Sequence, residues 1–154
     1  MPASYLIHPM LVHFPIVLFL SVPLIDAFIL IRGGDLSARS CLPDVALAVL
    51  VAGVTAGLAA IMFGYIAADH AAALGFPTAP VEQHEGFATT TVSVFAVLAA
   101  IRAHTRWRGI SLAGMRGWLF VAATAIGAVL VITTAYFGGH LVYDLGVNVA
   151  AVKH

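Results

Sequence analysis

Apolar residues fill four long segments of the chain, and short polar stretches separate them. The segments cover residues 5–31, 45–68, 81–101 and 117–137. At about 1.5 Å per helical residue, each can cross the roughly 30 Å hydrocarbon core of a bilayer. The pattern predicts a single domain, residues 1–154, folded as an all-α, four-transmembrane-helix, up-down bundle with a short tail at 141–154. Pro15 and Pro23 lie within the first segment, where interior prolines are expected to kink a helix.

The composition favours the same class of protein. Hydrophobic residues make up 62% of the chain, the mean hydropathy is +1.04 and only 9% of residues are charged, against about 25% in soluble domains. The net charge is zero and no basic stripe occurs, so we expect a lipid bilayer and no nucleic acid as a partner. The single Cys41 has no CxxCH context, which excludes a covalently attached c-type haem. The N-terminus lacks a basic region, so the first segment is expected to stay in the membrane rather than be removed as a signal peptide.

Basic residues mark one side of the predicted bundle. Six of the seven lie in the two polar stretches that join the first segment to the second and the third to the fourth: Arg32, Arg39, Arg102, Arg106, Arg108 and Arg116. By the positive-inside rule these loops are cytoplasmic. The sequence therefore predicts a multi-pass protein of the bacterial inner (cytoplasmic) membrane with both termini and the tail in the periplasm.

Histidines mark the opposite side. With this topology, five of the seven fall at the periplasmic end of the four segments: His8, His13, His70, His84 and His140. His8 has an alternative role as a helix cap, and His70 and His140 as water-exposed helix ends. His13 and His84 lie about one turn inside their helices, where ionisable residues are rare and usually functional. His104, among arginines, is expected to be a solvated loop residue.

The spacing of the histidines favours haem. His8 and His13 are about 140° apart around a regular helix, so they cannot both bind one iron. A haem iron needs one or two axial imidazoles from different helices inside an apolar sheath. We expect helices one and three to be diagonal, which makes His13 with His84 the first predicted ligand pair. His70 with His140, or either with His8, is the second, and one or two haem b groups are possible.

The small residues and the carboxylates each have two possible roles. Gly57 and Gly64 belong to a run of small residues that forms either a tight helix contact or a groove for a flat cofactor, and such faces also make a homodimer plausible. Asp69, Glu82 and Glu85 are either surface charges or proton acceptors. Asp26, inside the first segment, is expected to pair with Arg32 or another loop arginine for a structural role.

Two stretches of the sequence resemble a known family. His8-Pro9-Met10-Leu11-Val12-His13-Phe14-Pro15, together with residues 138–147 (GGHLVYDLGV), is similar to a bacterial four-helix membrane family, domain of unknown function 2231. The resemblance covers nearly the whole chain, and His8, His13, Gly138, Gly139 and Tyr143 match its pattern. It implies an inner-membrane bundle, sometimes joined to or near c-type cytochrome modules, and assigns no activity.

The leading hypothesis is a membrane b-type cytochrome that transfers electrons between the quinone pool and a periplasmic redox partner, such as a c-type cytochrome or an oxidoreductase. It is an electron-transfer protein rather than a stand-alone enzyme. The alternative is a transition-metal binding or transport protein that holds Cu, Zn or Fe with the five periplasmic histidines and the carboxylates. A third possibility is an anchor subunit for a periplasmic oxidoreductase.

Overall fold

Every regular element between residues 4 and 149, the part of the chain that the computed structural model describes, is a helix. The elements are η1 (Ser4–Leu6), α1 (Ile7–Leu11), α2 (His13–Ile31), α3 (Cys41–Ala73), α4 (Thr78–Arg108) and α5 (Gly114–Tyr143). They form four stretches long and apolar enough to cross a membrane: Ser4–Ile31, Cys41–Ala73, Thr78–Arg108 and Gly114–Tyr143. The predicted all-helical, four-span fold is confirmed.

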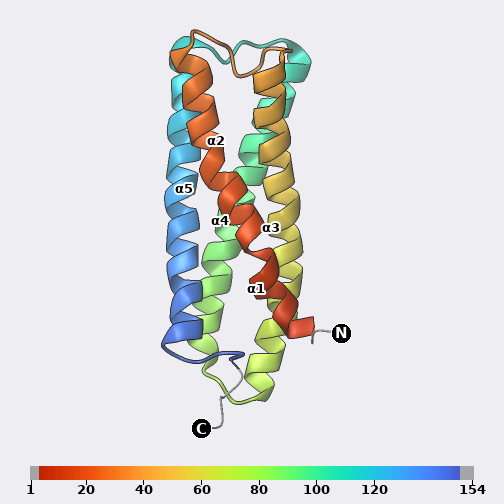
Figure 1. Cartoon of the computed structure of the whole chain (residues 1–154), viewed down its shortest axis with the longest axis vertical. Helices are drawn as coiled ribbons and strands as arrows, with labels where there is room; N and C mark the ends of the chain where they lie inside the picture. The colour runs from red at the N-terminus through yellow and green to blue at the C-terminus, as the bar shows by residue number, and fades with distance from the viewer. Residues whose placement is uncertain (1–3, 150–154) are drawn as a thin grey trace.

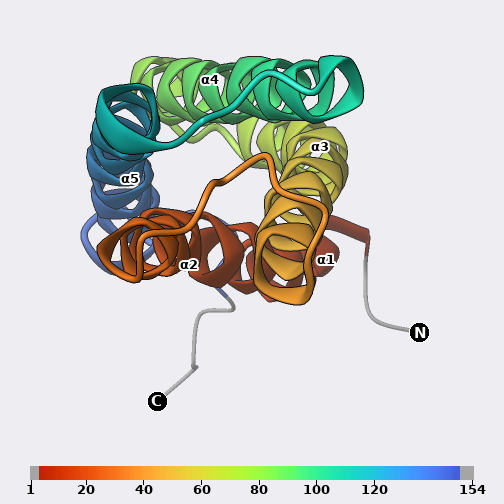
Figure 2. The same ribbon diagram turned by 90° about the horizontal axis from the view of Figure 1, so that it is seen from above.

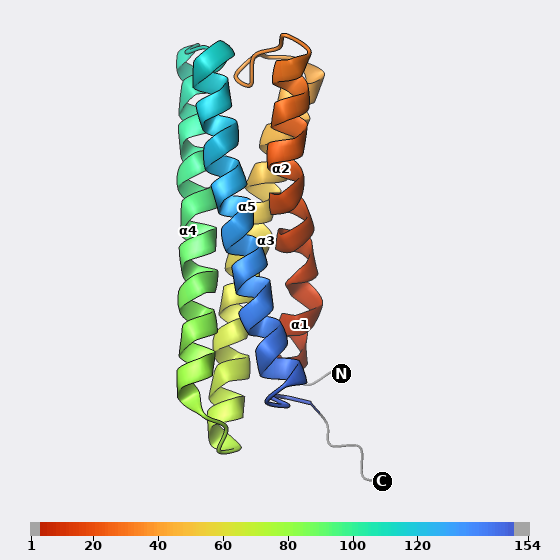
Figure 3. The ribbon, with the colours of Figure 1, turned by 90° about the vertical axis from the view of Figure 1, so that its left-hand side faces the viewer.

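The four spans form an up-down bundle. α2 and α4 each pack against both α3 and α5, so α2 and α4 are diagonal, as expected (Figure 2). Loops 32–40 and 109–113 lie at one end, which we call the loop end (Figure 1). The described chain begins and ends at the opposite end (Figure 3). We call this the histidine end, after His8, His70, His84 and His140.

The helices extend beyond the predicted apolar segments. α3 starts at Cys41 and continues to Ala73, and α4 continues to Arg108 before Gly109 ends it with a left-handed φ of 67°. The prediction that residues 102–116 form a loop is therefore wrong for its first half. The segments were predicted to end where polar residues begin. A helix can continue past that point into the membrane interface, because its backbone hydrogen bonds do not depend on whether its side chains are apolar or polar. Arg102 and His104 consequently lie on α4.

The first span is divided into α1 and α2 at Val12, whose backbone keeps helical dihedral angles (φ −59°, ψ −25°). α1 ends at Leu11 and α2 begins at His13, so Pro15 lies in the first turn of α2, where its missing N–H is least costly. Pro23 lies within α2 without ending it. α1 packs against α3, and Figure 1 shows it crossing over that helix. The tilt of the first span thus brings His8 to α3.

The two helical hairpins of the bundle are an internal repeat. Five buried positions of α2 match buried positions of α4 that lie 76 residues later, the separation of Asp26 and Arg102. These pairs are Pro15 and Thr91, Phe19 and Phe95, Val22 and Leu98, Asp26 and Arg102, and Ile29 and Thr105. Buried positions of α3 match those of α5 with an offset of 74: Pro43 and Gly117, Ala46 and Phe120, Leu50 and Thr124, Gly53 and Gly127, Gly57 and Val131, and Ala67 and Leu141.

Equivalent residues meet at the centre of the bundle. The Phe19 and Phe95 rings stack with centroids 3.9 Å apart. An added Cβ at Gly53 or at Gly127 would lie 2.8 Å from the nearer of these two rings, so the paired glycines make room for the paired aromatics. A residue that contacts its own equivalent lies on a twofold axis. The two hairpins are therefore related by a pseudo-twofold axis along the bundle, which we call the repeat axis.

A buried ion pair lies on the repeat axis towards the loop end. Arg102 donates from Nη1 to Asp26 Oδ1 at 2.5 Å, and both side chains have no exposed surface. Nη2 of Arg102 donates to the main-chain oxygens of Leu36 and Pro43. The partner of Asp26 is thus an arginine of the predicted loop region, but one that lies on a helix, and not Arg32, which is exposed. This pair joins α2 to α4 and to the loop at 32–40.

A carboxylate ties the two loops of the loop end together. Oδ1 of Asp35 accepts the backbone N–H of Ser37 at 2.8 Å and that of Leu112 at 2.9 Å. Burial raises the pKa of Asp35, but hydrogen bonds from the Ser111 hydroxyl and from the Ser37 and Leu112 amides outweigh it and bring the pKa below its ordinary value. The ionised form is thus the one that the fold stabilises.

Breaking the buried ion pair on one side should destabilise the protein strongly. We expect Asp26→Leu or Arg102→Leu to lower the free energy of unfolding by about 3–5 kcal/mol, because each leaves an uncompensated buried charge. The double variant should recover most of the loss. Thermal unfolding in detergent measures this, with Arg32→Leu as the control. Equal losses in the double and single variants would contradict a paired role.

The contribution of Asp35 should depend on pH. Because its folded pKa is lowered, its stabilisation is fully present above the unfolded pKa of about 3.9 and is lost as pH falls through the folded value. Asp35→Ala should unfold more easily than the wild type by about 1–3 kcal/mol at pH 7. This difference should shrink below about pH 4. A gap in unfolding temperature that is constant from pH 7 to pH 3 would show that the charge is not involved.

Candidate functional site

His8 is held against α3 by a main-chain hydrogen bond. Its Nδ1 lies 2.8 Å from the carbonyl oxygen of Ala60. A carbonyl oxygen only accepts, so Nδ1 carries the proton. A Cβ added at Gly64 would lie 3.2 Å from Nδ1 of His8. The imidazole thus occupies the space that a larger residue at position 64 would fill.

His84 is held against α5 in the same way. Its Nδ1 donates to the carbonyl oxygen of Thr134 at 3.1 Å, and a Cβ added at Gly138 would lie 3.0 Å from Cε1 of the ring. A short network continues from this contact, because the hydroxyls of Thr91 and Thr134 are 2.9 Å apart. His84 is half-buried between α4 and α5.

The two arrangements share one local design. In each, the glycine follows the accepting carbonyl by four residues: Ala60 and Gly64 on α3, Thr134 and Gly138 on α5. The Cα–Cβ bond in a helix points towards the N-terminus, so a side chain covers the turn before its own Cα. Glycine at this position uncovers the carbonyl one turn earlier and lets an imidazole reach it.

The two imidazoles face each other across the repeat axis. His8 and His84 obey the 76-residue offset, and their ring centroids are 6.2 Å apart with an interplanar angle of 82°. Both Nδ1 atoms donate to carbonyls, so in the neutral form of each ring Nε2 carries the lone pair. The histidine end therefore holds two imidazoles, from diagonal spans, whose Nε2 atoms can bind a metal or accept a proton.

The structure does not bring His13 to His84. His13 is the first residue of α2 and its side chain is exposed. His8 and His13 were predicted to face different sides of the helix. This agrees with the structure, in which only His8 faces the bundle interior. His8 lies on the same face of the span as the buried Pro15 and Val22, so the inward member is the one that the first predicted pair omitted.

The remaining histidines have other partners. His70 stacks on Tyr5 with centroids 4.0 Å apart, and His140 donates from Nδ1 to Asp144 Oδ2 at 2.6 Å. The structure thus does not pair His70 with His140. His104 lies on α4 with its ring edge towards Trp107. Of the predicted ligands, His8 and His84 alone are brought into contact with each other in the described part of the chain.

The two glycines named as a cofactor groove have different surroundings. Gly57 packs against Val92, which would lie 2.8 Å from an added Cβ, so it serves a tight helix contact. Gly64 adjoins His8. Gly53, like Gly57, faces into the bundle.

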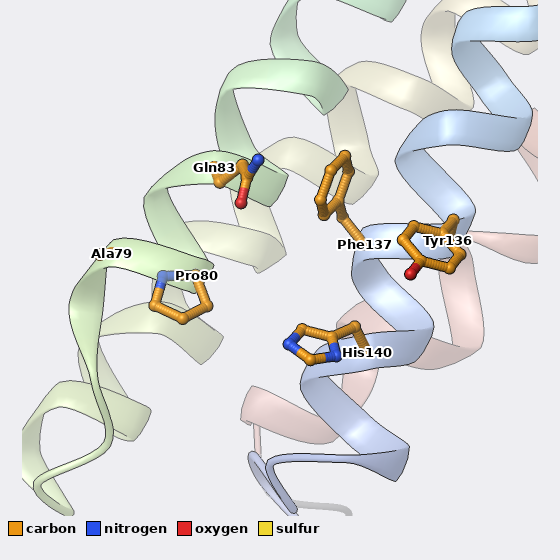
Figure 4. A pocket seen from close by; sticks show the side chains of 6 residues that line it. All are labelled: Ala79, Pro80, Gln83, Tyr136, Phe137 and His140. Atoms are coloured by element: carbon orange, nitrogen blue, oxygen red, sulfur yellow. The ribbon is translucent and has the colours of Figure 1, made fainter.

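Two surface hollows adjoin the histidine end. One, of about 280 Å³, lies between the start of α4 and the end of α5 and includes His140 (Figure 4). The other, of about 200 Å³, includes the three acidic residues Asp69, Glu82 and Glu85. Oε1 of Glu85 is buried without a hydrogen-bond partner. Neither hollow is lined by His8 or His84.

The sequence contains a pattern that could have identified His8 and His84 as neighbours, but composition and spacing within one helix do not reveal it. His8 and His84 are related by the same offset as Phe19 and Phe95, and Gly64 and Gly138 by the same offset as Gly53 and Gly127. Comparing the first half of the chain with the second would therefore have placed His8, rather than His13, opposite His84.

Comparison with known proteins identifies the family. A family model described as "Predicted membrane protein (DUF2231)" matches residues 5–151. No curated protein and no solved structure matches the chain. The match includes the four spans and the histidine pair, and it agrees with the resemblance seen in residues 8–15 and 138–147. The chain therefore belongs to the DUF2231 family of predicted membrane proteins.

Proposed function

We propose that the protein is a membrane b-type cytochrome in which His8 and His84 are the axial ligands of one haem iron. One observation supports this most directly. Both histidines donate Nδ1–H to a main-chain carbonyl, the usual arrangement of metal-binding histidines, which fixes the ring and raises the basicity of Nε2. This leaves Nε2 of each ring as the ligand atom.

The separation of the rings fits a shared iron. A metal–imidazole bond is about 2 Å and the ring centre lies roughly 1 Å beyond the nitrogen, so two imidazoles on opposite sides of one metal have centroids roughly 6 Å apart. The centroids of His8 and His84 are 6.2 Å apart. The small residues beside the rings, Gly64 and Gly138, allow both helices to approach the site.

The number of ligands favours haem over a bare ion. Within residues 4–149 no group of three or more His, Cys, Asp or Glu side chains could hold a metal ion. Protein-bound zinc commonly takes four ligands, whereas porphyrin supplies four nitrogens and needs only one or two from the chain. The alternative of a Cu, Zn or Fe binding or transport protein thus lacks a ligand set here.

Haem supplies reversible one-electron chemistry when bound. The chain would orient its ligands and surround it with apolar side chains. The carbonyls of Ala60 and Thr134 orient the ligands, and the stacked Phe19 and Phe95 close the bundle interior beneath them. The buried Asp26–Arg102 pair lies further along the repeat axis. The side chains between this pair and the two histidines would give the haem an apolar setting.

The side of the membrane on which the redox partner lies is inferred from the positive-inside rule. The arginines of the loop end favour a cytoplasmic location for that end, and the histidine end would then lie at the periplasmic face of the inner membrane. Electrons then pass between the quinone pool and a periplasmic partner, such as a c-type cytochrome or oxidoreductase. The protein acts as an electron carrier rather than as a stand-alone enzyme.

Removing either axial histidine should remove the haem. Protein purified from haem-replete cells should show a Soret band and, on reduction, a sharp α-band. His8→Ala and His84→Ala should each lower bound haem per polypeptide by roughly tenfold or more. His13→Ala, an exposed histidine of the same helix pair, is the matched control and should keep its spectrum. A colourless wild type, or an α-band that survives both substitutions, would refute the proposal.

Filling the glycine positions should loosen the ligands without removing them. In Gly64→Ala and Gly138→Ala the new Cβ crowds the imidazole and covers its carbonyl partner, so haem affinity should fall by roughly 10- to 100-fold. Haem titration of the apoprotein measures this. Gly86→Ala is the control, because an added Cβ there meets nothing within 4 Å. Equal affinities in all three variants would show that the carbonyl contacts do not support the ligands.

A further inference from the structure

The hollow between α4 and α5 has the features of a site for a flat ring with two oxygens. It is lined by Ala79, Pro80, Gln83, Tyr136, Phe137 and His140 and has a volume of about 280 Å³. In Figure 4 the side chains of Gln83, Tyr136 and His140 surround the gap, and the Phe137 ring borders it. The hollow thus combines aromatic surface with separated polar groups.

His140 is prepared to accept a proton in this hollow. Its Nδ1 donates to Asp144 Oδ2 at 2.6 Å, so the neutral imidazole keeps its Nε2 lone pair. The carboxylate of Asp144 also stabilises the imidazolium that protonation would create. Gln83, on the facing helix, both donates and accepts through its amide.

The apolar part of the hollow is rigid where it adjoins α4. The Phe137 ring stacks on Phe87 with centroids 4.9 Å apart, so its position is fixed by a neighbour on that helix. Tyr136 is 70% exposed and leaves the hollow open to the surrounding medium. Among residues 4–149, no Lys or Arg lines the hollow, which disfavours a phosphate group and favours a neutral ligand.

The internal repeat supplies a comparison within the same chain. The equivalent surface between α1 and α3 carries Ile7 in place of Gln83, Met62 in place of Tyr136, Phe63 in place of Phe137 and Ile66 in place of His140. Exposure is closely matched, at 68% for Met62 and 43% for Ile66 against 70% for Tyr136 and 41% for the His140 side chain. Of these two surfaces, only the one between α4 and α5 thus has hydrogen-bonding side chains at the positions of Gln83, Tyr136 and His140.

The hollow adjoins the proposed haem ligand. Gln83 precedes His84 in α4, and Phe137 precedes Gly138, where an added Cβ would lie 3.0 Å from the His84 ring. An electron donor in the hollow would therefore lie beside residues that adjoin His84 on α4 and on α5. The equivalent surface, beside His8, lacks the groups to orient such a donor.

We propose that this hollow binds the headgroup of a membrane quinol, with one hydroxyl donating to Nε2 of His140 and the other to the amide oxygen of Gln83. The proposal rests on the proposed haem site for its redox role, but not for binding. Oxidation of one quinol to the quinone breaks two O–H bonds and releases two protons and two electrons. Haem held by His8 and His84 would take up these electrons one at a time, and a periplasmic one-electron acceptor would remove each. The proton of the hydroxyl beside His140 would pass through Nε2 to water, and that of the hydroxyl beside Gln83 directly to water, because an amide is not a base.

Binding and electron transfer should both depend on the two polar residues. We expect the wild type in phosphatidylcholine nanodiscs to bind decylubiquinone, and His140→Ile and Gln83→Ile, which copy the other half of the chain, to bind it about tenfold more weakly. In stopped-flow experiments, decylubiquinol should reduce the haem of these variants at least tenfold more slowly. Their α-band and their reduction by dithionite should be unchanged, because neither residue binds the iron.

Control variants on the equivalent surface separate the possible outcomes. Met62→Ala and Ile66→Ala should match the wild type in both measurements. Equal binding by the wild type and His140→Ile would mean that the hollow holds lipid chains without recognising a headgroup, which overturns the proposal. A haem-free wild type that still binds decylubiquinone through His140 would refute the cytochrome and keep the quinol site, so the two failures are distinguishable.

Discussion

The site depends on main-chain carbonyls that glycines leave uncovered. In lipid a polar N–H has no water to bind, and every helical carbonyl already accepts one backbone hydrogen bond. The imidazoles of His8 and His84 each take the second lone pair of such a carbonyl, at Ala60 and at Thr134. A β-carbon at the glycine one turn later would shield it. Small residues in this bundle therefore determine ring orientation as well as helix spacing.

The repeat axis explains why these two histidines are neighbours. Three pairs of equivalent residues meet along it: the imidazoles at the histidine end, the stacked phenylalanines in the interior and the Asp26–Arg102 pair towards the loop end. A ligand held between twofold-related groups receives one group from each half of the chain. The arrangement suits a metal that needs two opposed ligands, and the surrounding surface departs from symmetry where Gln83 and His140 replace aliphatic residues.

Much of the fold could be predicted from the sequence because apolar length is a strong signal in membrane proteins. The number of spans, their order and the diagonal relation of the first to the third followed from it. Helix ends did not, since Arg102 belongs to α4 although its charge resembles that of a loop residue. The pairing of the histidines also did not follow, because the five-residue spacing of His8 and His13 shows that they face different sides of a helix but not which of them faces the bundle interior.

The ion pair also determines which hairpins can associate. Asp26 and Arg102 occupy equivalent places in the two halves, yet they carry opposite charges. If two first hairpins came together in the bilayer, two carboxylates would meet in an apolar interior, and two second hairpins would bring together two guanidinium groups. Either encounter is unfavourable because like charges repel strongly at low dielectric. The opposite charges thus distinguish the two halves of the repeat. During insertion, the first hairpin should associate with the second in preference to another copy of itself.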